Sequence, residues 1–234
     1  MAIDDSRFSV PLYTVAEAAR FLGVPPTTVG SWARGYTRRP RGRNQVVGAP
    51  IISSTTADRG APTIPFIGLA ESMVIAAFRR AGVSLQHIRR AVDVLERQIG
   101  VQHALASRHL YTDGAVILFD YAQREGDEAL GELTVVLSRQ RVFPEVVRDY
   151  LTRIEFDSDE WATRLVSPAI EERVVVMDPA RAFGQPIFLH GAARVEDVID
   201  RFRAGDRLTD VANDFGVPVD DVEDYLRVAL PAAA

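Results

Sequence analysis

A run of arginines near the N-terminus is the feature of this sequence with the clearest chemistry. Residues 34–43 read RGYTRRPRGR, and no aspartate or glutamate occurs between Ser31 and Ala57. The arginines are Arg34, Arg38, Arg39, Arg41 and Arg43. Guanidinium groups bind phosphate through paired N–H donors and can enter a minor groove, so this composition favours contact with nucleic acid. The prolines and glycines predict a loop with at most short strands, such as a wing beside a helix-turn-helix, and a solvated basic loop is the alternative.

Two predicted helices precede this segment and would position it. The first begins with a capping box formed by Thr14 and Glu17, and it ends at Gly23. Its apolar positions repeat at helical spacing and are Val15, Ala18, Ala19 and Leu22. The second begins at Pro25-Pro26, and its inward-facing positions are Val29 and Trp32. Helix, short turn and helix predict a helix-turn-helix, with a plain two-helix hairpin as the alternative.

The second helix would present a polar face without acidic residues. The side chains predicted on this face are Thr27, Thr28, Ser31 and Arg34. Short hydroxyls and arginine suit a major groove, where side chains meet phosphates and base edges. We therefore expect these four residues to approach the groove. The arginines expected to contact phosphate are Arg38, Arg39, Arg41 and Arg43.

Residues 66–99 predict two longer helices separated by Gly82, the second of them capped by Ser84. Their apolar positions are Leu69, Met73, Ala76 and Ala77, followed by Leu85, Ile88, Val92, Leu95 and Ile99. This apolar surface is large for a small lobe, so we expect it to pack against a second copy of the chain. A symmetric dimer would place two recognition helices about 34 Å apart, near one turn of DNA.

The remaining residue types argue against catalysis and against a metal or cofactor. The sequence has neither cysteine nor lysine, which excludes thiolate ligands, cysteine nucleophiles, Schiff bases and a P-loop lysine. The four histidines lack HxxxH and HxH spacing and are His87, His103, His109 and His190. Asp157, Asp159 and Glu160 could bind a cation, although a solvated turn explains them equally well. We expect no enzyme activity, no metal and no cofactor.

Charge divides the 234-residue chain unevenly. All 27 basic residues are arginine; residues 1–110 hold 14 of them against 7 acidic residues, and residues 111–234 hold 13 against 25. A basic front half joined to an acidic back half suggests two different partners, one of them nucleic acid. No apolar run reaches the roughly 20 residues of a membrane helix, and the N-terminus lacks an apolar signal region. We therefore expect a cytoplasmic protein without a membrane partner.

The middle of the chain predicts mostly strands. Asp113-Gly114 lies between two β-rich runs within residues 107–121, which is a strong hairpin signal. The other β-prone segments are 133–137, 153–157 and 161–166, and a short helix is predicted at 144–151. We expect a small mixed sheet over about 110–177. A second hairpin is expected to pair Val174–Met177 with Ile187–Leu189.

Three helices are predicted at the C-terminus, in a second helix-turn-helix-like arrangement. Their inward positions are Val195, Val198, Ile199 and Phe202, then Leu208, Val211, Ala212 and Phe215, and finally Val219, Val222, Tyr225, Leu226 and Leu230. The third helix carries four acidic residues, Asp220, Asp221, Glu223 and Asp224, against Arg227 alone. DNA would repel this face, whereas a basic protein partner would be attracted to it. A solvated acidic face is the alternative.

Several stretches resemble known families. YTVAEAARFLGV and TVGSWARG resemble the helix-turn-helix of MerR-type regulators. FRRAGVSLQHIRRAVDVLERQIGVQHALASRHLYTDG and DPARAFGQPIFLHGAARVEDVIDRFRAGDRLTDVANDFGV resemble a two-part family whose C-terminal portion is known as domain of unknown function 433. Its members are described as VapB-like antitoxins of type II toxin–antitoxin modules. The resemblance spans about Val10 to Leu230. It implies an autorepressor that silences a toxin with a PIN-like ribonuclease fold, recognising the toxin through its C-terminal part.

These observations predict a mostly helical α+β fold in three parts. A MerR-like winged helix-turn-helix at 8–105 binds DNA and dimerises, a β-rich region follows at 106–172, and a hairpin with the three-helix domain at 173–230 binds toxin. The predicted function is an antitoxin that neutralises a PIN-like ribonuclease and represses its operon as a homodimer on operator DNA. The alternative is a MerR-like transcriptional regulator without a toxin, whose acidic domain serves self-association or ligand sensing.

Overall fold

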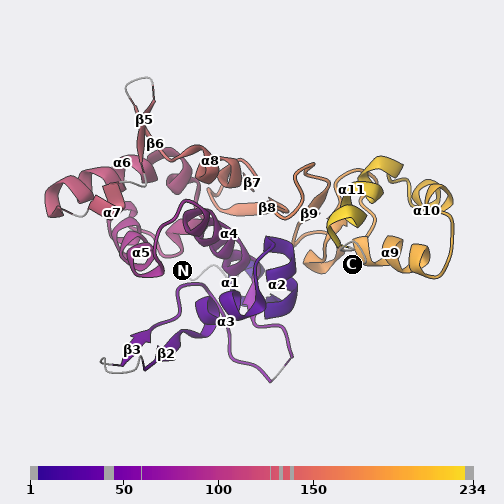
Figure 1. Ribbon diagram of the computed structural model, residues 1–234, viewed down its shortest axis with the longest axis horizontal. Helices are drawn as coiled ribbons and strands as arrows, with labels where there is room; N and C mark the ends of the chain where they lie inside the picture. The colour runs from indigo at the N-terminus through magenta and orange to yellow at the C-terminus, as the bar shows by residue number, and fades with distance from the viewer. Residues whose placement is uncertain are drawn as a thin grey trace. The chain divides into compact units, whose positions relative to one another are not determined.

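The computed structural model (Figure 1) describes residues 5–39, 45–58, 60–126, 128–131, 134–137 and 140–229. The chain divides into two compact units, Met1–Ala162 and Thr163–Ala234. Both contain helices together with short strands, so the fold is mixed α/β with helices predominating. Within the described ranges, no helix is long and apolar enough to cross a membrane.

The first unit is built from short strands and eight labelled helices within its described residues. Its helices are α1 (Ser6–Ser9), α2 (Val15–Leu22), α3 (Pro26–Arg34), α4 (Phe66–Arg80), α5 (Leu85–Ile99), α6 (Arg108–Glu125), α7 (Glu128–Gly131) and α8 (Glu145–Leu151). Its strands are β1 (Pro11–Tyr13), β2 (Tyr36–Arg38), β3 (Val46–Gly48), β4 (Ile64–Pro65), β5 (Val135–Leu137), β6 (Gln140–Val142) and β7 (Ile154–Phe156). The antiparallel pairs are β1 with β4, β2 with β3, and β5 with β6.

The predicted N-terminal helices are confirmed as α2 and α3. The Thr14 hydroxyl accepts a hydrogen bond from the Glu17 N–H at 3.2 Å, and the Glu17 carboxylate accepts one from the Thr14 N–H at 2.8 Å, which completes the capping box. Gly23 ends α2 with φ at 66°, a conformation that glycine adopts without steric penalty. Val29 and Trp32 of α3 are buried, as predicted.

Helix α4 forms the centre of the first unit. Every residue from Phe66 to Phe78 is buried, and only Arg79 and Arg80 at its end are exposed. The helix packs against α1, α2, α8 and the 3-10 helix Ala104–Ala106. A helix that is apolar on all sides belongs in a core. The α4 part of the apolar surface that we expected to face a second copy is therefore covered by the same chain.

The hairpin expected around Asp113-Gly114 is wrong, because this segment lies inside helix α6. Ser107 caps that helix by accepting a hydrogen bond from the His109 N–H at 3.1 Å. Gly114 is buried, and a Cβ at this position would lie 3.3 Å from the Phe143 ring. The glycine thus permits close packing between elements distant in sequence, and this tertiary contact outweighs the local turn signal.

Other predictions for the middle of the chain are confirmed. Strands β5 and β7 and helix α8 form where two β-prone runs and a short helix were expected. Strand β8 (Ala162–Val166), which begins on the last residue of the first unit, accounts for a third run. The region therefore combines the expected strands with one long helix that was not expected.

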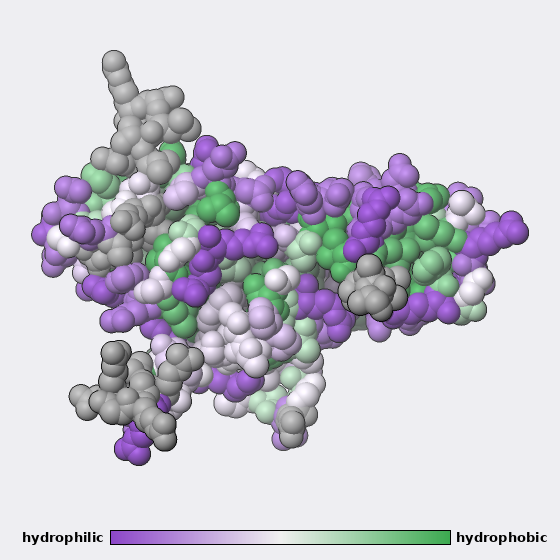
Figure 2. Space-filling view, in the orientation of Figure 1, coloured by the Kyte–Doolittle hydropathy of each residue, from purple (hydrophilic) through white to green (hydrophobic). Residues whose placement is uncertain are grey.

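The second unit consists of a small antiparallel sheet and three helices. Strand β9 (Val175–Met177) pairs with β8 and with β10 (Ile187–Phe188), which confirms the expected second hairpin. The helices are α9 (Val195–Arg203), α10 (Leu208–Phe215) and α11 (Val219–Ala229). Their core contains Val195, Val198, Ile199, Val211, Ala212 and Val222. Figure 2 also shows apolar surface over α10 and α11, where Phe215 and Tyr225 are only partly buried.

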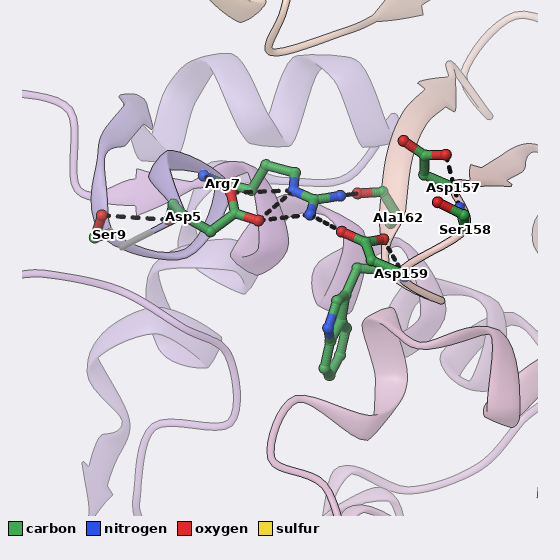
Figure 3. A network of polar contacts seen from close by, with 8 residues as sticks. Asp5, Arg7, Ser9, Asp157, Ser158, Asp159 and Ala162 are labelled. Carbon is green, nitrogen blue, oxygen red and sulfur yellow. Dashed lines mark hydrogen bonds and ion pairs between the residues drawn. The ribbon is translucent and has the colours of Figure 1, made fainter. Parts of the chain in front are cut away.

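An ion-pair network fastens helix α1 to the turn between β7 and β8 (Figure 3). Arg7 lies between two carboxylates; it donates to Asp5 Oδ2 at 2.5 Å from one nitrogen and also pairs with Asp159. Its side chain is largely buried. Of the other two acidic residues of this turn, Glu160 pairs with Arg108 at 3.5 Å, and the Asp157 carboxylate accepts a hydrogen bond from the Ser158 N–H at 2.6 Å. The carboxylates that we considered for a cation site therefore interact with arginines or with the backbone of the turn.

Candidate nucleic-acid interface

Helix α3 exposes two of the four residues predicted on its polar face and partly buries the other two. Thr27 and Arg34 are exposed, whereas Thr28 and Ser31 are half-buried. Thr27, Ser31 and Arg34 follow the i, i+4, i+7 spacing of a single helix face. The Ser31 hydroxyl donates to the Thr28 carbonyl at 2.7 Å, and its oxygen keeps lone pairs that can accept a further hydrogen bond.

The arginine-rich segment forms a hairpin directly after α3. Strands β2 and β3 pair in antiparallel fashion, with Tyr36 opposite Gly48 and Arg38 opposite Val46. Figure 1 shows this β2–β3 hairpin projecting from the helical body of the first unit. Arg39 is exposed; Arg41, Arg43 and the side chain of Arg38 lie outside the described residues. Strand β2, which carries Arg38, therefore follows α3 directly.

The segment after the hairpin returns to α3 and satisfies its last carbonyl groups. The Ile51 N–H donates to the Trp32 carbonyl at 2.8 Å, and the Ser54 hydroxyl donates to the Ala33 carbonyl at 2.7 Å. Carbonyls in the last turn of a helix have no partner within the helix, so they need partners of this kind. Both ends of the hairpin are therefore attached to the C-terminal end of α3.

Two residues in contact at the base of the hairpin, Tyr36 and Arg89, were not predicted from the sequence. The Arg89 guanidinium of α5 lies 5.8 Å from the centre of the Tyr36 ring, a cation–π contact. The ring also lies over Gly48, where a Cβ would come within 2.5 Å of it. Gly35 joins α3 to β2 with φ at 72°, and a Cβ there would lie 2.3 Å from the Gly48 carbonyl oxygen. These contacts fix the direction in which strand β2 leaves α3.

A buried carboxylate supports the same segment from below. Glu71 of α4 is only 5% exposed. One of its oxygens accepts a hydrogen bond from the Ser53 N–H at 2.5 Å, and the other lies 2.9 Å from His103 Nδ1. Hydrogen bonding to Glu71 raises the pKa of His103, burial opposes this, and the nearby charge of Glu96 adds to it. A charged residue within the apolar sequence FIGLAESMVIAAF was the signal that could have revealed this cluster.

The cluster does not have the geometry of a serine hydrolase. The Ser53 hydroxyl lies 2.9 Å from His103 Nδ1, the same nitrogen that contacts Glu71. A catalytic triad needs serine and carboxylate on opposite imidazole nitrogens. Within the described parts of the chain, no group of three or more histidine, aspartate or glutamate residues could hold a metal ion.

The acidic residues predicted on the third C-terminal helix have different environments. Asp220 is exposed, and Glu223 and Asp224 are half-buried and both pair with Arg227. Asp221 is buried and lies 2.8 Å from His190 Nδ1, in the turn before α9. Asp220 and Glu223 therefore reach the surface of α11, Asp224 is largely covered, and Asp221 holds the helix to the body of its unit.

A two-helix motif that continues into a basic hairpin places the first unit among the helix-turn-helix proteins. A family described as "Putative DNA-binding HTH domain" matches residues 11–92. The chain is 44% identical over 226 residues, 94% of each sequence, to "Putative antitoxin VapB45" of Mycobacterium tuberculosis (strain ATCC 25618 / H37Rv). It therefore belongs to the same protein family as that relative, which agrees with the expected resemblance to an antitoxin family.

Two further comparisons support this assignment. "Uncharacterized protein Rv2308" of the same organism is 23% identical over 228 residues, which cover 92% of this chain and 88% of the relative. The crystal structure of Rv2018 from Mycobacterium tuberculosis superposes with a TM-score of 0.82 at 41% identity, covering 94% of this chain and 99% of that one. The likeness to MerR-type regulators and to domain of unknown function 433 remains a prediction.

Proposed function

We propose that this protein is an antitoxin that binds operator DNA through its first unit and silences a PIN-like ribonuclease through its second. The observation that carries the DNA half is the exposed polar face of α3 next to an arginine-rich hairpin, in a stretch without any acidic residue. The name of the 44% identical relative supports the antitoxin half.

In the proposed DNA complex, α3 enters the major groove and the hairpin follows the phosphate backbone. Thr27, Thr28, Ser31 and Arg34 are assigned to the groove, and the arginines assigned to phosphate are Arg38, Arg39, Arg41 and Arg43. Binding as a homodimer would engage two half-sites and repress the protein's own operon. Because Gly35 and Tyr36 fix the base of the hairpin, strand β2 has a set direction relative to α3 before DNA arrives.

In the proposed toxin complex, the second unit attracts a basic protein. Residues 163–234 hold 8 arginines against 13 acidic residues, whereas residues 1–162 hold 19 of each. The whole net charge of −5 therefore belongs to the second unit. Complementary charge accelerates the encounter between proteins. The carboxylates of α11 assigned to this encounter are Asp220, Glu223 and Asp224.

The experiment that tests the proposal is a native pull-down of the tagged full-length chain, with mass spectrometry of the co-purified proteins. We expect a small stoichiometric partner whose ribonuclease activity disappears in the complex. If only DNA co-purifies at low salt, the toxin half is wrong and the chain is a regulator without a toxin.

Charge variants then locate the interface within the second unit. The variant D220N/E223Q/D224N should slow association with the ribonuclease and reduce its salt dependence. The matched control E196Q/D197N/D200N removes three exposed carboxylates from α9 and should leave association near the wild-type rate. Equal effects of both variants would contradict the assignment to α11.

A further inference from the structure

The turn between β9 and β10 exposes an aromatic side chain almost completely. Phe183 has 89% of its surface accessible, more than any other large apolar residue of the described chain. Contact between a phenyl ring and water is unfavourable, so a partner that buries this ring gains binding free energy.

The backbone of this turn is strained where it presents the ring. Ala182 and Phe183 both have positive φ, at 45° and 53°, which residues with side chains rarely adopt. Hydrogen bonds hold the turn closed: the Arg181 N–H donates to the Asp178 carbonyl at 3.0 Å, and the Gly184 N–H donates to the Arg181 carbonyl at 2.8 Å. Strain of this kind persists where surrounding structure enforces it, and it is common at binding sites.

The neighbours of Phe183 anchor the turn to the sheet. Ala182 packs against a small buried cluster composed of Val166, Val176 and Ile187. The buried Asp178 carboxylate accepts a hydrogen bond from the Ala180 N–H at 2.9 Å and pairs with Arg164 at 3.6 Å. The ring is therefore held outward on a rigid support, and ordering this turn on binding costs little conformational entropy.

We propose that Phe183 is the anchor by which the second unit docks onto the toxin, with its ring in an apolar pocket of that basic protein. This inference rests on the function proposed above. The excess of acidic residues in the second unit opposes the other common use of an exposed phenylalanine, insertion between DNA bases. The same charge attracts a basic protein, and rigid aromatic side chains are typical interface hot spots.

The test measures the affinity of the full-length chain for the purified ribonuclease from the pull-down, by calorimetry. Phe183→Ala should weaken binding by about 30-fold or more, the size of a hot-spot effect, while Phe183→Leu retains part of the contact. The matched control is Tyr111→Ala on α6 of the first unit, which removes an aromatic side chain that is 52% exposed. It should leave the affinity unchanged.

Phe183→Gly separates docking from folding. Because glycine accepts positive φ, this variant should keep a thermal midpoint near that of the wild type and still lose affinity as Phe183→Ala does. If both variants bind like the wild type, the anchor is overturned while the proposed function stands. If the wild type itself binds no ribonuclease, the proposed function fails and the anchor with it. A wild-type dimer that Phe183→Ala dissociates, with unchanged affinity for the ribonuclease, would show that the ring joins two copies of the chain instead.

Discussion

Replacing Glu71 by glutamine should destabilise the first unit in a pH-dependent way. The wild-type carboxylate is buried, accepts from the Ser53 N–H and contacts His103 Nδ1. A hydrogen bond to a charged group contributes about 1.5–3 kcal/mol, and glutamine keeps the size of the side chain without its charge. We therefore expect Glu71→Gln to lower the free energy of unfolding by about 2 kcal/mol at pH 6.

The sign of the pH dependence follows from His103. Because hydrogen bonding to Glu71 raises the pKa of His103 in the folded state, the protonated imidazole stabilises the fold. This contribution is fully present below the unfolded pKa of about 6.5 and is lost as pH rises through the folded pKa. Glu96 is the other acidic residue acting on the imidazole, so Glu71→Gln leaves only its weaker influence. The difference between wild type and variant should be larger at pH 6 than at pH 8.5.

Urea unfolding followed by tryptophan fluorescence measures this difference. The two tryptophans, Trp32 and Trp161, both lie in the first unit, so their fluorescence reports on that unit. Glu125→Gln, which neutralises an exposed glutamate at the end of α6, is the control and should leave stability unchanged. Equal stability of Glu71→Gln and wild type at pH 6, or the same loss at both pH values, would refute this account of the cluster.

Three other substitutions test neighbouring parts of the structure. Gly35→Ala should lower the free energy of unfolding by about 1–3 kcal/mol and weaken DNA binding, because the new Cβ would displace the base of the hairpin. An unchanged urea midpoint together with an unchanged gel shift would contradict this. Thr14→Ala removes the helix cap and should lower the free energy of unfolding by about 1 kcal/mol, seen as a lower thermal midpoint. An unaltered thermal midpoint would mean that the cap does not stabilise the protein. Hydrogen bonding from Arg7 lowers the pKa of Asp5. Burial raises the pKa of Asp159, but the hydrogen bonds from Arg7 and from the Trp161 N–H, together with the charge of Arg7, outweigh burial and lower it. The stabilisation that these two carboxylates contribute is present above their unfolded pKa near 4 and is lost as pH falls. Arg7→Ala should therefore lower the free energy of unfolding at neutral pH and make its decline in acid less steep. A decline as steep as in the wild type would contradict this.

Local signals in the sequence predicted the helix-turn-helix well. The capping box of Thr14, the glycine at position 23 and the buried pair Val29 and Trp32 depend on residues within a few positions of each other. Ser84 likewise caps α5 by accepting from the His87 N–H, as expected. Such interactions form wherever the local sequence allows, so they can be predicted without knowledge of the tertiary fold.

Predictions failed where distant residues decide the structure. Gly114 lies inside α6 with the Phe143 ring close to it, and no local pattern predicts that contact. The apolar surface of α4 was assigned to a second copy because the sequence did not show that α8 would cover it. At the candidate site, Arg89 over Tyr36 and Glu71 beside His103 join residues more than thirty positions apart, beyond the reach of spacing arguments.

The salt dependence of DNA binding tests the central claim most directly. The probe is a duplex from immediately upstream of the protein's own coding sequence. The four arginines assigned to phosphate would give a slope of log K against log salt near −3.6 per chain, or about −7 for a dimer, and the slope reaches a ceiling of about −9 for a dimer only when Arg34 contacts phosphate as well. R38A/R39A should make the slope shallower by about 1.8 per chain, while the control R203A/R207A on the second unit should not change it. A slope that is the same in wild type and R38A/R39A, or DNA binding that does not respond to salt, would contradict the assignment of the arginine-rich hairpin to DNA.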